Sequence, residues 1–422
     1  MAKAIIPSVK GTRDFYPGDM AFRSWLYRTI RTVSESFGYQ EYDGPFIEKV
    51  DLYAAKSGEE LVKENFMFQD RGGEMVTLRP ELTPTLARMV AQRQGELVFP
   101  LHWWSFGPFW RYERPQKGRT REFFQWNADI IGANSTEADA ELIVLCIKFF
   151  QAVGLSASQV GIRVNERQLL EAEFSRLAIS QEQKTFVFHL LDRREKLDAV
   201  AWDAFALEGG LSSNQLDGLK GLLQDKDLWK KSESLKRLFE IIAAVGLSDY
   251  VTYDPQVIRG LDYYTGVVFE ARDLDKEGRA ILGGGHYDNL VGEVGGEPLP
   301  GVGFAMGDVM IRLVLEKYGC LPKLEAAPAS VLVTSFDVTF TQKMFTLAAQ
   351  LRNSGLSVIL YPEAAKLPKQ LKYADRLGVR FVVIIGPDED AAGKVTIKDL
   401  QNRTQETVDR SELSVAINRM HG

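Results

Sequence analysis

Apolar residues recur every three or four positions over residues 19–37, as expected for an amphipathic helix with one buried face. Gly38 follows them and is typical of a helix end. A second helix is predicted from Thr136, where Thr-Glu-Ala-Asp resembles a capping box, to Gly154. The apolar residues of the first helix are Phe22, Trp25, Leu26, Ile30, Val33 and Phe37.

Between these helices, alternating apolar and polar residues with many aromatics predict strands. Such alternation is typical of antiparallel sheets, whose two faces meet different surroundings. We therefore predict an α+β fold in which helices flank a large, mostly antiparallel sheet. The strand segments are 39–42, 76–79, 103–113 and 123–131.

The chain changes character after residue 166. Residues 166–250 are rich in Leu, Lys, Glu, Asp and Gln and predict a helical insertion, after which strand-like sequence resumes at 266–271. A Pro/Ala-rich hinge precedes residues 330–422, where strand-like and helix-like segments alternate as in a βαβαβ unit with a parallel or mixed sheet. We expect one domain over 1–325, carrying the insertion at about 166–250, and an α/β domain over 330–422.

Composition limits the classes of function. The chain has 422 residues, 45% of them hydrophobic, which suffices for two or three domains with their own cores. A net charge of −6 argues against a small basic binding module, but it permits nucleic-acid binding at a local basic surface. Cys146 and Cys320 are too few for a disulfide framework or a zinc site. We expect no signal peptide and no membrane-spanning segment, and hence a cytoplasmic protein with no membrane partner.

The densest polar segment, residues 109–129, predicts a strand, a basic loop and a second strand. Two-residue periodicity puts Gln125, Asn127 and Asp129 on one face of the second strand and Trp126 on the other. A polar row on a central strand must face water or a ligand, because unpaired polar groups are costly to bury.

Arg111 and Glu113 share a face of the first strand, and cations follow in the loop. Guanidinium groups bind phosphate through paired hydrogen bonds, so this loop suits a polyanion. A solvated hairpin with ordinary surface charge is the alternative. The loop cations are Arg114, Lys117, Arg119 and Arg121.

Three shorter segments carry further candidates. Residues 259–266 combine glycines with Arg259, Tyr263 and Tyr264, although a surface arginine and core tyrosines would look the same. The glycine run at 283–285 permits close backbone approach, but it lacks the context of a phosphate-binding fingerprint.

In the third segment, residues 77–84, prolines flank a pair of polar residues. Glu81 and Thr83 could bring a carboxylate and a hydroxyl together at the end of a strand. Alternatively, they could cap the helix that follows.

In this order, the segments resemble the histidyl-tRNA synthetase family over nearly the whole chain. Residues 10–14 (KGTRD) are similar to the opening signature of the family. The first predicted helix, the strand after it and Pro45 are together similar to class II motif 1, which builds a dimer interface. Residues 111–129 match motif 2. Residues 259–266 and 283–288 match the two histidine-specific signatures, and residues 301–307 match the start of motif 3.

This resemblance implies a class II synthetase catalytic domain and a C-terminal anticodon-binding domain, whose most basic face would be residues 366–372. It implies a histidine–tRNA ligase that activates L-histidine with ATP to histidyl-adenylate and transfers it to the 3' end of tRNA(His). It also implies a homodimer, and Mg²⁺ that arrives with ATP rather than in a site built by the protein alone. The insertion would touch the acceptor arm of the tRNA.

The resemblance implies roles for single residues. The α-amino group of histidine would contact Glu81, Thr83 and Gln125. The imidazole would lie among Asp129, Tyr264 and Tyr287, with Tyr263 nearby.

Other residues would serve the nucleotide and the tRNA. Arg259 would act as the catalytic cation on the α-phosphate of ATP, and Arg111 would hold that phosphate and the histidine carboxylate. Glu113 and Arg119 would lie near the nucleotide. The motif 2 loop would meet the tRNA acceptor end through Gln116, Lys117 and Arg119.

Two positions depart from the family pattern. Met310 stands at the usual motif 3 arginine, and Arg312 is rotated by roughly half a helical turn from it, so the sequence leaves the adenine clamp unassigned. His286 stands where the family commonly has arginine, and we assign it no catalytic role.

Two other functions are compatible with such a domain. The regulatory subunit of ATP phosphoribosyltransferase resembles it and binds histidine without charging tRNA, but generally lacks the C-terminal domain. A non-catalytic tRNA-binding paralogue would fit the departure at Met310. The presence of residues 330–422, Arg111, Gln125 and Arg259 favours the ligase.

Overall fold

The computed structural model describes residues 5–54, 65–116, 118–194, 197–258, 264–275, 280–324 and 327–421. The chain divides into two compact units. One comprises Met1–Asp14 and Arg23–Pro322, and the other comprises Phe15–Phe22 and Lys323–Gly422. No helix among the described residues is long and apolar enough to cross a membrane.

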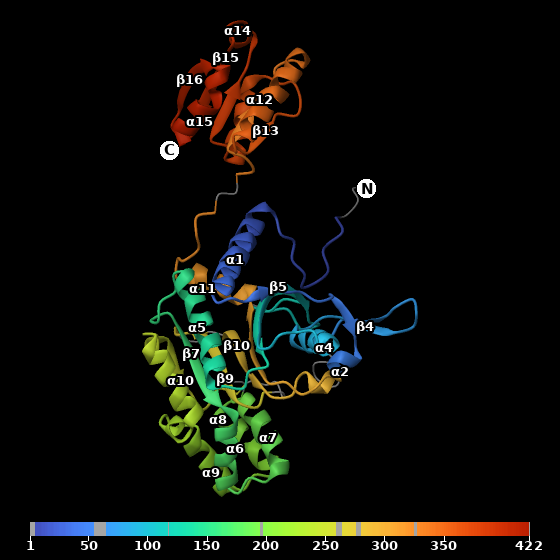
Figure 1. Cartoon of the computed structure of the whole chain (residues 1–422), viewed down its shortest axis with the longest axis vertical. Coiled ribbons are helices and arrows are strands. Elements are labelled where there is room, and N and C mark those ends of the chain that lie inside the picture. The colour runs from blue at the N-terminus through green and yellow to red at the C-terminus, as the bar shows by residue number, and fades with distance from the viewer. Residues whose placement is uncertain are drawn as a thin grey trace. The chain divides into compact units, whose positions relative to one another are not determined.

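The first unit is built on an eight-stranded sheet with the order β1-β5-β6-β11-β10-β9-β7-β8 (Figure 1). Only the pairs β1–β5 and β7–β8 are parallel, so the prediction of a mostly antiparallel sheet is confirmed. The strands are β1 (Gln40–Glu41), β5 (Leu101–Trp110), β6 (Glu122–Ile131), β7 (Val160–Glu166), β8 (Val251–Tyr253), β9 (Val267–Asp273), β10 (Ala280–Tyr287) and β11 (Gly301–Gly307).

The two faces of β6 differ as predicted. Trp126 is fully buried, and its ring lies 5.1 Å from that of Phe149 and 4.7 Å from that of Phe304. Phe149 belongs to α5 (Thr136–Ala152), which packs on this sheet together with α11 (Asp308–Lys317). Burial of these large rings holds the helices in position, because each excludes well over 100 Å² of apolar surface from water.

The ends of two predicted elements differ from expectation. The side chain of Ser135, not Thr136, caps α5, since its hydroxyl accepts a hydrogen bond from the backbone of Ala138. The two neighbouring hydroxyl residues compete for this role, and only one has the extended backbone of a cap. Strand β5 ends at Trp110, before Arg111 and Glu113, where the chain turns into a loop containing Pro115.

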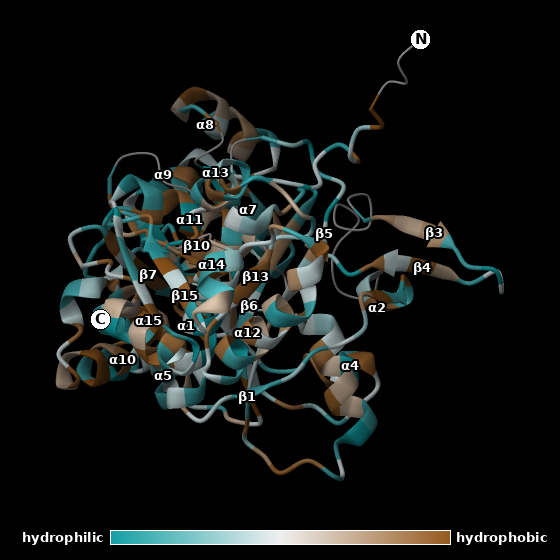
Figure 2. Ribbon diagram, turned by 90° about the horizontal axis from the view of Figure 1, so that it is seen from above, coloured by the Kyte–Doolittle hydropathy of each residue, from teal (hydrophilic) through white to brown (hydrophobic). Residues whose placement is uncertain are grey.

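Further strands and helices are described in the N-terminal part of the chain, where the first residues of α1 (Pro17–Ser36) belong to the second unit. This α1 is the helix predicted over residues 19–37. A three-stranded antiparallel sheet presents exposed apolar side chains, and its strand β3 has hydrophobic colouring in Figure 2. The remaining elements are β2 (Ile47–Lys49), α2 (Asp51–Ala54), β3 (Met67–Gln69), β4 (Met75–Leu78) and α4 (Thr83–Arg93).

Residues between β7 and β8 fold as helices, in agreement with their composition. Polar side chains begin several of them: Ser180 and Ser212 form capping boxes, and Asp198 and Ser232 also accept backbone hydrogen bonds. The helices are α6 (Arg167–Arg176), α7 (Gln181–Asp192), α8 (Ala199–Glu208), α9 (Ser213–Leu222), η1 (Leu228–Lys231), α10 (Glu233–Ala244) and η2 (Ser248–Tyr250). In Figure 1, α6, α7, α8 and α9 group beyond the end of β7, whereas α10 lies beside α5.

The second unit contains a five-stranded mixed sheet, as predicted, in the order β13-β12-β14-β15-β16. On β12, Val331 and Val333 belong to one buried cluster and Leu332 to another, so both faces of the sheet are covered. Its elements are β12 (Val331–Val333), η4 (Val338–Phe340), α12 (Thr341–Asn353), β13 (Val358–Leu360), α13 (Leu367–Leu377), β14 (Phe381–Ile384), α14 (Pro387–Ala391), β15 (Lys394–Asp399), β16 (Thr404–Asp409), η5 (Arg410–Glu412) and α15 (Leu413–His421).

Candidate active site

A cavity of about 1110 Å³ opens on the polar face of β6. Its walls come from the β5–β6 loop, from β6, β7, β9, β10 and β11, from the start of α11 and from the end of α7. The predicted site residues on these walls are Arg111, Glu113, Gln116, Arg119 and Gln125.

The motif 2 loop carries one carboxylate between two guanidinium groups. Arg119 donates a hydrogen bond of 2.9 Å to Glu113, and Nη1 of Arg111 lies 3.9 Å from the same carboxylate. The Nε atom of Arg111 also donates to the carbonyl of Pro80 at 3.0 Å. These contacts orient two cations at the cavity wall, where they can receive a phosphate or carboxylate.

The contact of Arg111 with Pro80 brings residues 77–84 to this site. Glu81 is buried, and its carbonyl accepts a hydrogen bond of 3.3 Å from the hydroxyl of Tyr53. Thr83 begins α4, whose N-cap position is Leu82, and the Leu82 side chain makes no capping hydrogen bond. The N-cap position is therefore neither Glu81 nor Thr83. Glu81 directly follows Pro80, the contact of Arg111, and neither Glu81 nor Thr83 is among the residues that line the cavity.

A buried cluster of acid and phenols lies further along the same face of β6. The hydroxyl of Tyr287 on β10 donates a hydrogen bond of 3.2 Å to Asp129, and both side chains are buried. Burial raises the pKa of Asp129 to about 7, although the hydrogen bond from Tyr287 lowers it. Burial also raises the pKa of Tyr287 well above its ordinary value, so this phenol stays a donor. Asp129 lies about 13 Å from Gln125 along the strand.

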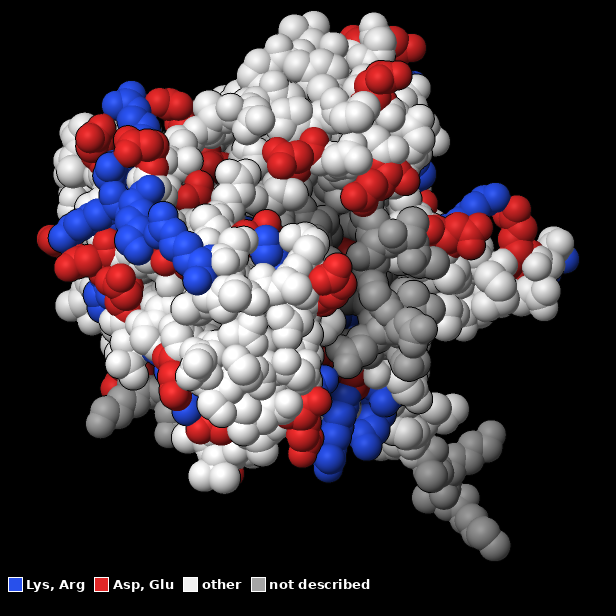
Figure 3. Space-filling view, turned by 90° about the horizontal axis from the view of Figure 1, so that it is seen from below, with Lys and Arg blue, Asp and Glu red and all other residues white. Residues whose placement is uncertain are grey.

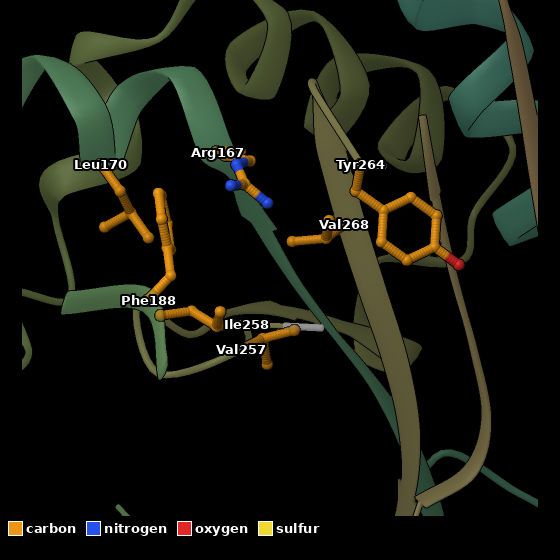
Figure 4. A pocket seen from close by; sticks show the side chains of 7 residues that line it. All are labelled: Arg167, Leu170, Phe188, Val257, Ile258, Tyr264 and Val268. Atoms are coloured by element: carbon orange, nitrogen blue, oxygen red, sulfur yellow. The ribbon is translucent and has the colours of Figure 1, made fainter. Parts of the chain in front are cut away.

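Tyr264 and Tyr42 pack in the same buried cluster as Tyr287. Figure 4 shows Tyr264 beside Val268, with its hydroxyl directed away from Phe188 and Leu170 of the insertion. The Tyr42 hydroxyl is buried and has no hydrogen-bond partner among the described residues. Tyr42 is not among the residues predicted for the site, because its only signal in the sequence is an aromatic residue in a short predicted strand.

Glycines on the neighbouring strands make room for this cluster. A Cβ atom on Gly303, the register partner of Asp129, would lie 2.0 Å from a carboxylate oxygen of Asp129. Cβ atoms on Gly301 and Gly285 would lie 2.7 Å from the Tyr287 ring and 2.8 Å from the Tyr264 ring. Within the run at 283–285, a Cβ atom on Gly284 would also lie 2.2 Å from the carbonyl oxygen of Gly303, so the close backbone approach predicted for this run is confirmed.

Gly303→Ala is expected to raise the KM for histidine, the substrate that the family resemblance implies, at least tenfold and to lower the free energy of unfolding by about 1–3 kcal/mol, because the new methyl group displaces the Asp129 carboxylate. Steady-state kinetics and urea unfolding measure the two effects. Gly221→Ala is the control, since Gly221 lies within α9 with open space at its Cβ and alanine favours helix. Equal histidine KM values for wild type and Gly303→Ala would contradict the prediction.

His286 lies next to Tyr287 on β10 and has a structural partner. Its Nδ1 atom lies 2.9 Å from a carboxylate oxygen of Asp139 on α5, and both side chains are buried. Burial disfavours the charged imidazole, but the hydrogen bond and charge of Asp139 outweigh this, so the pKa of His286 lies above its ordinary value. His286 thus ties the sheet to α5, in keeping with the absence of a catalytic assignment.

The opening signature joins motif 2 to motif 3, a connection that local patterns did not reveal. Arg13 forms an ion pair of 2.9 Å with Asp308 at the start of α11. The same carboxylate accepts a hydrogen bond of 2.9 Å from the backbone of Phe124 on β6. Met310 follows on the cavity wall, whereas Arg312 pairs with Glu316 on α11 at 2.9 Å and does not line this cavity.

Three predicted site residues, Arg259, Tyr263 and Lys117, lie outside the described residues. Ile258, which directly precedes Arg259, lines the cavity. Their roles stay predictions.

Comparison with known proteins agrees with this fold. A family model described as "Histidyl-tRNA synthetase" matches residues 11–309, and one described as "Anticodon binding domain" matches residues 329–420. The histidine–tRNA ligases of Leptospira biflexa serovar Patoc and Thermoplasma volcanium are 37% and 38% identical to the chain, and each alignment covers 97% of both proteins. The crystal structure of histidyl-tRNA synthetase from Nostoc sp. PCC 7120 superposes with a TM-score of 0.81 at 28% identity, covering 99% of this chain and 100% of the other.

The antiparallel sheet with its cavity, together with the α/β unit, is the fold of a class II aminoacyl-tRNA synthetase. Sequence identity over nearly the full length narrows this class further. The chain belongs to the histidyl-tRNA synthetase family, and the regulatory-subunit alternative is not favoured.

Proposed function

We propose that the chain activates L-histidine with ATP and transfers the histidyl group to the 3' end of tRNA(His). The observation that carries this proposal is the buried Asp129–Tyr287 pair on the same face of β6 as the cavity with paired guanidinium groups, about 13 Å along the strand from Gln125. A neutral imidazole presents one N–H donor and one nitrogen acceptor. A carboxylate and a phenol are the complementary groups for these two atoms.

We propose the following roles in histidine binding. Asp129 accepts a hydrogen bond from the imidazole N–H while Tyr287 holds the Asp129 carboxylate, and Tyr264 faces the second nitrogen, with Tyr263 nearby. Glu81, Thr83 and Gln125 bind the α-amino group. A site built from such groups rejects apolar amino acids of similar size by about 10⁴ or more, because its own polar groups would lose their partners.

We further propose that Arg111 contacts the histidine carboxylate and the α-phosphate of ATP. An oxygen of this carboxylate attacks the α-phosphorus, and pyrophosphate leaves. Arg111 and Arg259 stabilise the negative charge that gathers on the phosphate in the transition state, and Glu113 and Arg119 orient the nucleotide. The Mg²⁺ that accompanies ATP would neutralise the leaving pyrophosphate, and Glu113 and Glu270 on the cavity wall offer oxygen atoms of the kind it accepts.

In the second step, the terminal ribose hydroxyl of the tRNA attacks the carbonyl carbon of histidyl-adenylate, and AMP leaves. We assign Gln116, Lys117 and Arg119 of the motif 2 loop to the acceptor end. The domain over 330–422 would bind the anticodon, and Lys366, Lys369 and Lys372 lie exposed along the basic segment proposed for it.

We propose a homodimer that forms through the N-terminal part of the chain. The three-stranded sheet and the residue before it expose apolar side chains that a partner would cover. Sedimentation of the purified protein tests whether it is a dimer. We also propose a cytoplasmic location. The exposed side chains are Phe46, Ile47, Met67, Phe68 and Met75, each 41–49% accessible.

Formation of histidyl-tRNA by the purified protein tests the function. The assay uses a tRNA(His) transcript, ATP, Mg²⁺ and radiolabelled histidine, with a second tRNA as control. A protein that binds histidine but catalyses neither histidine-dependent ATP–pyrophosphate exchange nor charging would instead fit a regulatory subunit. Exchange without charging would contradict the second step.

A further inference from the structure

The arginines that the sheet and the motif 2 loop contribute to the cavity all have carboxylate partners. Arg111 and Arg119 share Glu113, as described above. Arg163 on β7 pairs with Asp254 at 3.1 Å, and Arg272 on β9 forms a close ion pair with Glu270. Much of the positive charge on these walls is therefore balanced locally.

Arg194 differs from these arginines in origin and in surroundings. It follows the end of α7 in the helical insertion and lines the cavity together with Leu191 and Asp192. Its guanidinium carbon lies 4.7 Å from the ring centroid of Trp202, which is fully buried and whose indole nitrogen donates to the carbonyl of Leu190 at 2.8 Å. No described carboxylate forms an ion pair with it.

An aromatic platform of this kind fixes a guanidinium without neutralising it. The ring attracts the cation through its quadrupole, and the planar donors stay available at the edge of the guanidinium. Asp192 lies on the same wall, and basic side chains form separate clusters among acidic ones on the face that carries the insertion (Figure 3). Among the described arginines that line the cavity, Arg194 is thus the one with no ion pair to a described carboxylate.

We infer that Arg194 binds a phosphate in the single-stranded 3' end of the tRNA and so positions the terminal nucleotide for transfer. This inference rests on the proposed function. The cavity volume of about 1110 Å³ exceeds the roughly 300–1,000 Å³ of most small-molecule sites, which leaves room for a nucleotide beside histidyl-adenylate. In the proposed function Arg111 serves ATP and Arg119 also meets the acceptor end from the motif 2 loop, so Arg194 would add a second contact for the tRNA from the wall that the insertion forms.

Arg194→Ala and Arg193→Ala form a matched pair for the test. Arg193 is exposed, stacks on Phe205 at 4.9 Å and does not line this cavity. For Arg194→Ala we expect kcat/KM for tRNA(His) in charging to fall about tenfold or more, as for loss of a charged hydrogen bond. Activation of histidine does not involve the tRNA, so the rate of ATP–pyrophosphate exchange without tRNA should stay within twofold of the wild-type rate. Arg193→Ala should change neither rate, and Arg194→Lys should recover part of the charging.

Binding of intact tRNA(His) and of a shortened tRNA(His) distinguishes two explanations for a charging defect. Either Arg194 contacts the 3' end directly, or its replacement distorts the helical insertion. Wild type and Arg194→Ala should bind tRNA(His) that lacks its last three nucleotides with equal affinity. The presence of these three nucleotides should raise the affinity of the wild-type protein alone. The slope of log affinity against log salt for intact tRNA should fall by about 0.7 in the variant, as for one lost phosphate contact on a single strand.

The inference is overturned if Arg194→Ala charges tRNA like wild type, if exchange falls in parallel with charging, or if binding of the shortened tRNA weakens equally. These outcomes differ from failure of the proposed function, in which the wild-type protein itself forms no histidyl-tRNA. The comparison of intact and shortened tRNA still tests the phosphate contact in that event.

Discussion

Arg111→Ala is expected to lower the rate of histidine-dependent ATP–pyrophosphate exchange by about 10²–10³-fold, the usual effect of removing one group that stabilises charge in the transition state. Arg111 lines the cavity, is oriented by the carbonyl of Pro80 and lies 3.9 Å from Glu113. Its guanidinium is thereby fixed before substrates bind, so little reorganisation opposes catalysis. Initial rates of exchange at saturating ATP and histidine measure the effect.

Arg312→Ala is the matched control for this prediction. Arg312 pairs with Glu316 along α11, and Met310, not Arg312, occupies the cavity wall. Its replacement should leave exchange within about twofold of wild type. Exchange in Arg111→Ala within threefold of wild type would contradict the role of Arg111, whereas a large loss in Arg312→Ala would mean that Arg312 takes part in nucleotide binding.

Asp129→Asn is expected to have opposite effects on function and on stability. The KM for histidine should rise by about 10²-fold, because the variant loses a charged acceptor in a buried site and leaves its partners poorly satisfied. The free energy of unfolding at pH 8 should rise by up to a few kcal/mol, since the variant no longer buries a carboxylate. Histidine-dependent exchange and urea unfolding of the same preparations measure the two quantities.

The pH dependence of stability follows from the raised pKa of Asp129. Its value is about 7 in the folded chain and 3.8 in the reference state, so between these values the folded chain binds more protons than the unfolded chain. Stability from this group therefore falls as the pH rises through about 4 to 7, and the loss is complete above about 7. Asp129→Asn should abolish this part of the slope, while Asp217→Asn, at an exposed position of α9, should preserve it.

The same titration affects catalysis. If the carboxylate accepts the imidazole N–H, the KM for histidine in wild type should rise as the pH falls below about 7, and this rise should be reduced in Asp129→Asn. A variant less stable than wild type at pH 8, with an unchanged histidine KM, would mean that the Asp129 carboxylate serves the fold alone.

Local patterns were sufficient where neighbouring residues decide the structure. The alternation of Gln125, Trp126 and Asp129 predicted a strand with a polar and an apolar face, because successive side chains of a strand point to opposite sides. The composition of residues 166–250 predicted helices for a comparable reason, since intrinsic propensity and capping act within a few residues. Errors at Ser135 and at the end of β5 concern boundaries, where adjacent residues have similar propensities.

The sequence by itself determined the element types, the mixed α/β character of residues 330–422 and, through the order of its motifs, the family. Only the tertiary structure decided which groups meet, because such contacts depend on chain closure over long separations: Arg13 and Asp308 are 295 residues apart, and Asp129 and Tyr287 are 158 apart. The need for glycine at residue 303 and the arrival of Arg194 at the cavity likewise follow from strand register and helix packing, which no local pattern encodes.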